Sequence, residues 1–131
     1  MKYKRLKVTN FKSFHGETEF TFSTSKDKPI TIVFGLNGSG KTALIGAMYW
    51  GLFGLKNGKI ECDPNLDVHQ GTNGEHKFRG LFNFKASSAL APGDSTTCSV
   101  EVHFDHEDVE YRVSRTLLAS KDSSGNVAIK E

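Results

Sequence analysis

A glycine-rich octapeptide is the segment of this sequence whose residue types and spacing point most directly to chemistry. Residues Gly35 to Thr42 read GLNGSGKT and match the pattern GxxxxGK, followed by Ser or Thr, at every fixed position. Glycines let the backbone turn so that successive N–H groups face inward around an anion. Lys41 supplies a mobile positive charge for phosphate oxygens, and the hydroxyl of Thr42 is a suitable Mg²⁺ ligand. The octapeptide therefore predicts a phosphate-binding loop (P-loop), with ATP and Mg²⁺ as the expected ligands.

The elements on either side of this loop must place it. Ile30 to Phe34 is a continuous run of strand-favouring residues without a polar face, which predicts a strand buried on both sides. From Lys41 the apolar residues recur at helical spacing, which predicts a helix that ends at Gly54. Its positive dipole end would point at the same phosphates. Gly46 and Gly51 would let the helix pack closely on a sheet. Its predicted apolar face consists of Leu44, Ile45, Met48, Leu52 and Phe53.

Period-two alternation predicts further strands before and after this unit. Apolar and polar residues alternate over residues 6–8, 18–22, 100–104 and 109–113. The last two segments would form a hairpin around the polar turn Asp105 to Asp108, and a turn at residues 123–126 would bring residues 127–129 back onto residues 117–118. A short helix is expected around Phe78 to Lys85, and a polar surface insertion at Asn57 to Gly74. The expected fold is α/β: a P-loop NTPase amino-terminal lobe with a mixed sheet, flanking antiparallel strands and a P-loop helix.

Composition sets broad limits on the class of protein. With 131 residues, 37% hydrophobic and 24% charged, the chain has the profile of one soluble globular domain. It contains no apolar run of the length that a membrane-spanning helix needs. Its two cysteines, Cys62 and Cys98, form no disulfide framework, which favours a reducing, cytoplasmic setting.

Charge by itself does not identify a partner. A net charge of +2 is too small to argue for nucleic acid. The basic residues before Glu17 favour a solvated strand face over a phosphate-contacting patch; they are Lys2, Lys4, Arg5, Lys7 and Lys12.

Two further residue sets resemble functional sites in their residue types but have simpler interpretations. His103 and His106, with Cys98 nearby, are possible metal ligands in type, but no standard zinc spacing occurs and alternation puts His103 on a polar strand face. Tyr49 and Trp50 fit a core or an interface better than a base-stacking platform.

The sequence also resembles a known family. The stretch Leu6 to Phe14, which contains Asn-Phe-Lys-Ser-Phe, followed by Gly35 to Thr42, resembles the amino-terminal half of an SMC/RecF/SbcC-type ATPase head. These are ABC-type ATPases of chromosome maintenance and double-strand-break repair. Ala47 to Gly54 and the strands at residues 100–104 and 111–115 are similar to the elements after the family's P-loop. Within the group, Phe34 to Gly38 and Leu81 to Asn83 resemble DndD, the ATPase of DNA phosphorothioate systems.

The resemblance carries expectations about the site. It implies that residues 1–131 are the P-loop lobe of an ATPase head, incomplete without a downstream Walker B half. It implies that Lys12 and Ser13 approach the nucleotide, in addition to the P-loop residues. The binding set is then Lys12, Ser13, Asn37, Gly38, Ser39, Gly40, Lys41 and Thr42, with Thr42 as the metal ligand and no catalytic residue. The family's Walker B carboxylates, signature motif and coiled coil do not occur in these residues, and Gln70 comes too early to be the Q-loop glutamine.

It also implies partners and an activity. In such proteins a second head closes over the nucleotide, and the carboxy-terminal half of the head completes the site. DNA, and a nuclease or another system subunit, are further expected partners, with no membrane association and a cytoplasmic, nucleoid-associated location in a bacterium. The full protein would be an ATPase, whereas residues 1–131 alone would bind ATP and hydrolyse it poorly because no general base is present.

Two alternatives stay open at this point. One is a self-contained P-loop kinase or nucleotide-dependent switch, which would need a second buried strand ending in a carboxylate; none is evident before Glu131. An Asn-Lys-x-Asp element is absent, which weighs against GTP. The other is a degenerate module that uses the fold only for protein contacts.

Overall fold

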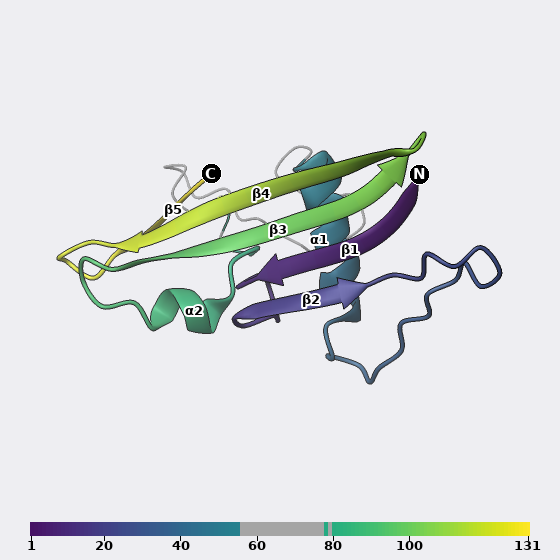
Figure 1. Ribbon diagram of the computed structural model, residues 1–131. Helices are drawn as coiled ribbons and strands as arrows, with labels where there is room; N and C mark the ends of the chain where they lie inside the picture. Colours follow the sequence, from purple (N-terminus) through teal and green to yellow (C-terminus); the bar gives the residue numbers. More distant parts are fainter. Residues whose placement is uncertain (56–77, 79) are drawn as a thin grey trace.

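The fold is a five-stranded antiparallel sheet with one long helix against a single face (Figure 1). The computed structural model describes residues 1–55, 78 and 80–131. The strand order is β2-β1-β3-β4-β5. The strands are β1 (Lys2–Thr9), β2 (Glu17–Thr21), β3 (Ser95–His106), β4 (Val109–Lys121) and β5 (Val127–Lys130), and the helices are α1 (Lys41–Phe53) and α2 (Phe84–Ser88).

The strands follow the predicted alternation. Leu6 and Val8 of β1 are fully buried and pair in register with Val102 and Val100 of β3. The predicted hairpin between β3 and β4 is confirmed, with its reversal at Glu107 and Asp108, both in the left-handed region. Residues 127–129 pair with residues 119–121 as a further antiparallel strand, so the turn predicted at residues 123–126 is confirmed as well.

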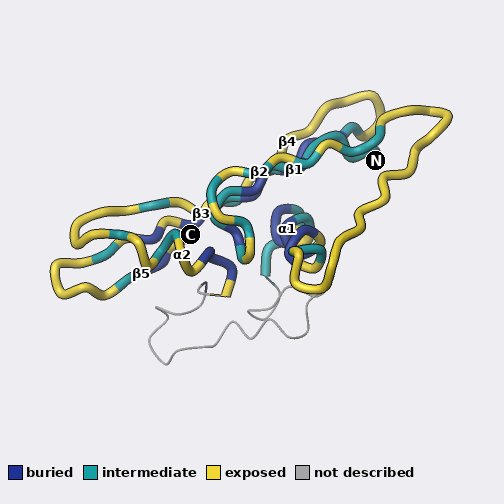
Figure 2. Tube along the Cα trace, turned by 90° about the horizontal axis from the view of Figure 1, so that it is seen from below, coloured by how far each residue is buried: buried dark blue, intermediate teal, exposed yellow. Residues whose placement is uncertain are grey.

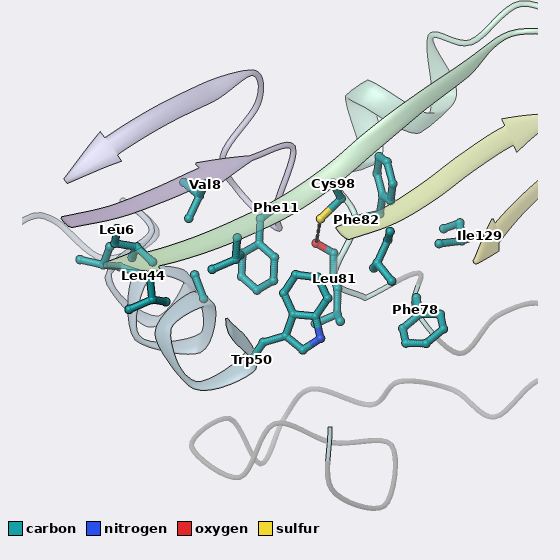
Figure 3. Packing of buried hydrophobic residues seen from close by; sticks show 14 of the residues in the cluster. Leu6, Val8, Phe11, Leu44, Trp50, Phe78, Leu81, Phe82, Cys98 and Ile129 are labelled. Atoms are coloured by element: carbon teal, nitrogen blue, oxygen red, sulfur yellow. Dashed lines mark hydrogen bonds between the residues drawn. The ribbon is translucent and has the colours of Figure 1, made fainter. Parts of the chain in front are cut away.

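The core lies between the sheet and α1, and it continues towards α2 (Figure 3). Phe11 and Trp50 stack with ring centroids 5.6 Å apart, and both side chains are fully buried. Trp50 is thus a core residue, as predicted. The Cys98 thiol lies 3.8 Å from the Leu81 carbonyl oxygen, and burial raises the pKa of this thiol to about 12. Cys98 therefore stays protonated and packs as a small apolar residue.

Helix α1 exists where it was predicted, but its buried face matches the prediction only in part: Leu44 is buried, and Met48 and Leu52 are partly buried against the core. The buried residues of the helix are mostly small: Ala43, Leu44, Gly46, Ala47, Trp50 and Gly51. Ile45 and Phe53, two members of the predicted apolar face, are exposed. A Cβ placed on Gly51 would lie 2.9 Å from a methyl of Val102 and 3.0 Å from a methyl of Val100. The close packing predicted at Gly51 is confirmed, and it explains why small residues form the contact face.

The prediction of a doubly buried strand at Ile30 to Phe34 is wrong in this structure. These residues are an irregular, exposed segment between β2 and the P-loop, and Phe34 is 90% exposed. Figure 2 shows this segment extending away from the rest of the molecule. All strand pairs among the described residues are antiparallel, so the expected mixed sheet is not observed in this part of the chain. A strand needs a neighbour for its backbone N–H and C=O groups, and the described sheet provides none here.

Three smaller expectations remain. The short helix begins at Phe84 rather than near Phe78, because Asn83 caps it by accepting a hydrogen bond from the N–H of Ala86. The predicted insertion at residues 57–74, with Gln70 and Cys62, lies outside the described residues. Within the described ranges, no helix combines the length and the hydropathy needed to cross a lipid bilayer.

Candidate phosphate-binding site

The P-loop and the turn between β1 and β2 line one open cavity of about 530 Å³. Most residues of the expected binding set take part, with Ala43 in addition; the lining consists of Lys12, Ser13, Asn37, Gly38, Gly40, Lys41, Thr42 and Ala43. Ser39 is not part of the lining; its N–H donates to the carbonyl oxygen of Leu36 at 3.2 Å, inside the loop. Segments far apart in the sequence thus meet at one site.

The start of α1 leaves its backbone donors unpaired by any side chain. Gly40 is the N-cap residue, in the left-handed conformation with φ 97°, and no side chain caps the helix. The first turn also contains no acidic residue. Since the first N–H groups of a helix have no partner within the helix, they are available to an anion in the cavity, and the helix dipole favours negative charge there.

Lys41 lies within the same loop. Its ammonium group donates to the carbonyl oxygens of Gly35 at 2.5 Å and Leu36 at 2.7 Å. These contacts hold the positive charge at the mouth of the P-loop. Because the side chain is long and its head is compact, Lys41 can exchange these carbonyl partners for phosphate oxygens without a change of fold.

The turn after β1 brings Lys12 and Ser13 to the same cavity. Phe11 anchors the turn in the core on Trp50, and Phe14 packs edge-on against Phe20 of β2, with ring centroids 5.5 Å apart. A Cβ built on Gly40 would lie 3.0 Å from the hydroxyl oxygen of Ser13 and 3.3 Å from the Phe14 ring. The turn and the P-loop are therefore in direct contact.

The chemistry of the lining suits polyphosphate binding. Two lysines, two hydroxyl side chains and the unpaired start of a helix face the cavity, and none of the described lining residues is acidic. This combination attracts anions and offers donors to phosphate oxygens. The lining offers no carboxylate that could activate a water molecule, so these eight residues provide binding groups but no general base.

The basic residues of β1 lie on the sheet and are paired. Lys4 forms ion pairs with Asp105 at 3.3 Å and Glu110 at 3.2 Å, and Lys7 pairs with Glu17 at 2.9 Å. Such partly exposed pairs are weak individually, but they neutralise the strand's charge locally. The pairing favours the solvated-face interpretation of this basic segment.

His103 is separated from Cys98 by the sheet alternation, and His106 lies at the far end of β3, eight residues along the strand from Cys98. His103 Nε2 lies 2.5 Å from Glu101 Oε1, and this hydrogen bond lowers the pKa of the Glu101 carboxyl. Cys98 faces the core, whereas Glu101 and His103 occupy odd positions of β3, with Arg5 also 3.2 Å from the His103 ring nitrogen. Within the described part of the chain, no group of three or more His, Cys, Asp or Glu residues is arranged to hold a metal ion.

One residue of this region was not recognised as part of the site from the sequence. Asn83 is buried, and its side-chain nitrogen donates to the carbonyl oxygen of Lys12 at 2.7 Å. The available signal was an N-cap residue type directly before a short helix, which indicates a cap but not a long-range contact.

Comparison with known proteins agrees with this geometry. Residues 5–131 match the AAA_23 family, described as an AAA domain. The chain is 28% identical over 120 residues to the DNA double-strand break repair Rad50 ATPase of Halobacterium salinarum, covering 92% of this chain and 10% of that protein. It is 41% identical over 56 residues to the protein of the same description from Methanosarcina acetivorans, covering 43% of this chain and 5% of the relative.

The family assignment rests on the length of the match to the AAA_23 family, which extends over residues 5–131. The chain spans a tenth or less of the length of these curated relatives, whereas the family match includes nearly all of its own residues. The family match and the Rad50 relatives together confirm the resemblance to SMC-like ATPases. The narrower resemblance to DndD stays a prediction. The chain belongs to the AAA domain family of P-loop proteins and is a distant relative of the Rad50 ATPases.

Proposed function

We propose that this chain is the ATP- and Mg²⁺-binding lobe of an SMC/Rad50-like ATPase head that works on DNA. The observation that carries the proposal is the cavity in which Lys12 and Ser13 face Lys41 across the uncapped start of α1. Family membership supports ATP as the nucleotide. The description of the relatives as double-strand break repair ATPases supports a role in DNA repair or a related DNA process.

Each lining group has a role in this proposal. Backbone N–H groups of the P-loop bind the β-phosphate, and Lys41 contacts the β- and γ-phosphate oxygens. The Thr42 hydroxyl fits one position of a Mg²⁺ shell, because Mg²⁺ takes few protein ligands and retains several waters. When bound, Mg²⁺ neutralises phosphate charge. Lys12 and Ser13 contact the phosphates from the turn after β1.

Hydrolysis needs groups beyond these residues. The described lining contains no carboxylate, so a general base must come from another part of the polypeptide or from a partner. In this proposal the missing catalytic groups come from two sources. One is a carboxy-terminal half of the head, which carries the Walker B residues, and the other is a second head that closes over the nucleotide. A self-contained kinase is disfavoured for the same reason. DNA and a nuclease or other system subunit are further proposed partners, in a cytoplasmic setting.

The test compares binding with turnover in the 131-residue chain. We expect Mg²⁺–ATP to bind and raise the melting temperature, since a ligand that binds only the native state stabilises it. Lys41→Ala should weaken binding by at least ten-fold, whereas Lys85→Ala, on the exposed helix α2, should not change it. ATP turnover should be near the background rate. Rapid turnover that Lys41→Ala abolishes would contradict the missing-base argument, and an unchanged melting temperature would contradict ATP binding itself.

A further inference from the structure

The turn that places Lys12 and Ser13 at the cavity has an unusual backbone. Asn10 and Lys12 both have φ of 49°, in the left-handed region. This conformation is disfavoured for residues with a side chain, and it persists where surrounding contacts hold it. The position of the cavity's second wall therefore depends on whatever holds these two residues. Asn10 is held in part by Gly16, whose N–H donates to Asn10 Oδ1 at 2.9 Å, and by the carbonyl oxygen of Thr97, which accepts from Asn10 Nδ2 at 2.9 Å.

The other contacts come from a segment about 70 residues later in the chain. The Asn83 side-chain nitrogen donates to the carbonyl oxygen of Lys12 at 2.7 Å. The Asn83 N–H donates to the carbonyl oxygen of Asn10, also at 2.7 Å, and the Lys12 N–H donates to the carbonyl oxygen of Leu81 at 2.7 Å. Three short hydrogen bonds thus fix the backbone on both sides of Phe11.

The orientation of the Asn83 amide is itself determined. Its Oδ1 accepts from the N–H of Ala86 at 3.1 Å, so Nδ2 must face Lys12. The residue is only 6% exposed, and loss of a buried donor leaves the Lys12 carbonyl without this partner. Asn83 therefore connects the start of α2 to the turn at the cavity.

We propose that Asn83 is a positioning residue for nucleotide binding: it holds the Lys12–Ser13 turn against the P-loop. This inference rests on the proposed function. The Ser13 hydroxyl already lies 3.0 Å from where a Gly40 side chain would begin. A small displacement of the turn would consequently move Lys12 and Ser13 out of reach of the phosphates bound at the P-loop.

The test measures affinity for the non-hydrolysable analogue AMP-PNP with Mg²⁺, by calorimetry on the complete natural polypeptide. Asn83→Ser retains an oxygen that can cap α2 but loses the amide donor to Lys12. We expect the Kd to rise about ten-fold, the usual effect of losing a well-placed polar contact. Asn83→Asp is the second variant; it keeps the shape and the cap, replaces the donor by an acceptor, and should weaken binding at least as much.

A double-mutant comparison separates positioning from general stability. If Asn83 acts through the turn, Asn83→Ser should change the Kd less than two-fold in a Lys12→Ala, Ser13→Ala background. Ile129→Ala, in the core at β5, is the stability control and should leave the Kd unchanged. An equal loss in both backgrounds, or no loss in the wild-type background, would overturn the proposal for Asn83. If Lys41→Ala binds AMP-PNP as well as wild type, the proposed function itself fails.

Discussion

At Gly40 the P-loop lies close to the turn that carries Ser13. The φ of 97° at Gly40 belongs to a region that residues with a Cβ rarely adopt, and an added Cβ would meet the Ser13 hydroxyl at 3.0 Å. The substitution Gly40→Ala would therefore have two separate free-energy costs. One is the backbone conformation, about 1–2 kcal/mol, and the other is a contact that must displace one wall of the cavity.

These costs can be separated with a matched glycine. Gly125, in the turn between β4 and β5, has φ of 87° and nothing within 4 Å of an added Cβ. Gly125→Ala should lower the free energy of unfolding by about 1–2 kcal/mol, the backbone cost alone. Gly40→Ala should lower it by at least as much and also weaken Mg²⁺–ATP binding about ten-fold. Urea unfolding and calorimetry measure the two effects; equal nucleotide affinity in both variants would show that the Gly40 contact does not shape the cavity.

At the scale of elements, α1 depends on its small contact face. Gly51 faces Val100 and Val102 of β3 so closely that no Cβ fits without movement. The helix also receives a hydrogen bond at its carboxyl end, because Arg115 Nε of β4 donates to the Gly51 carbonyl oxygen at 3.2 Å. The distance between helix and sheet is thus set at the same residue by packing and by a polar contact.

Gly51→Ala should accordingly destabilise the fold. Alanine favours a helix over glycine by about 1 kcal/mol, but overpacking costs about 1–3 kcal/mol, so we expect a net loss of up to about 2 kcal/mol. Combining it with Val102→Ala removes the nearer of the two obstructing methyl groups and leaves that of Val100. The double variant should then be more stable than the sum of the two single losses predicts, as measured by urea unfolding. Strict additivity would mean that the helix, rather than the valine, moves to make room.

The same helix shows what the sequence could and could not predict. Spacing predicted its existence and the Gly54 stop, because helical periodicity and a C-terminal glycine are local signals. It favoured large residues such as Ile45 for the buried face, since hydropathy increases with size. The structure buries Ala47 and Gly51 instead, because the helix lies too close to the sheet for larger side chains. Gly51 was a local signal of this close approach, but the exposure of Ile45 depends on tertiary packing and has no local signal.

The candidate site likewise contains residues that the sequence could predict and one that it could not. The P-loop is a contiguous motif, and the residue types and spacing of its glycines and lysine are typical of phosphate binding. The loop could therefore be predicted from its residues. Lys12 and Ser13 were inferred from family resemblance, and the structure places both beside the loop. Asn83 could not be identified because its contact with Lys12 spans 71 positions. Only the folded chain brings that donor and acceptor together.

At the scale of the whole molecule, the segment before the P-loop exposes several large apolar side chains to solvent. Ile30 and Ile32 are 74% and 78% exposed, and Phe34 is 90% exposed. Single exposed apolar residues are common, but a contiguous apolar run beside a binding site marks a surface that is covered by something else. The pattern of the run is that of a strand, and the chain spans only 10% of a relative that it matches over 92% of its own length.

If the chain is part of the head that we propose, we expect residues 30–34 to form a strand in the presence of its carboxy-terminal half, which would give a mixed sheet. Hydrogen exchange tests this directly, because a paired strand protects its amides and an exposed segment does not. In the 131-residue chain the amides of residues 30–34 should exchange at nearly the unprotected rate, and in the complete natural polypeptide they should be slowed at least a hundred-fold. The amides of β3, already paired on both sides with β1 and β4, should be protected in both samples. Fast exchange at residues 30–34 in the complete polypeptide would mean that the apolar run leads into the P-loop as a free connection, and that its hydrophobic character serves another contact.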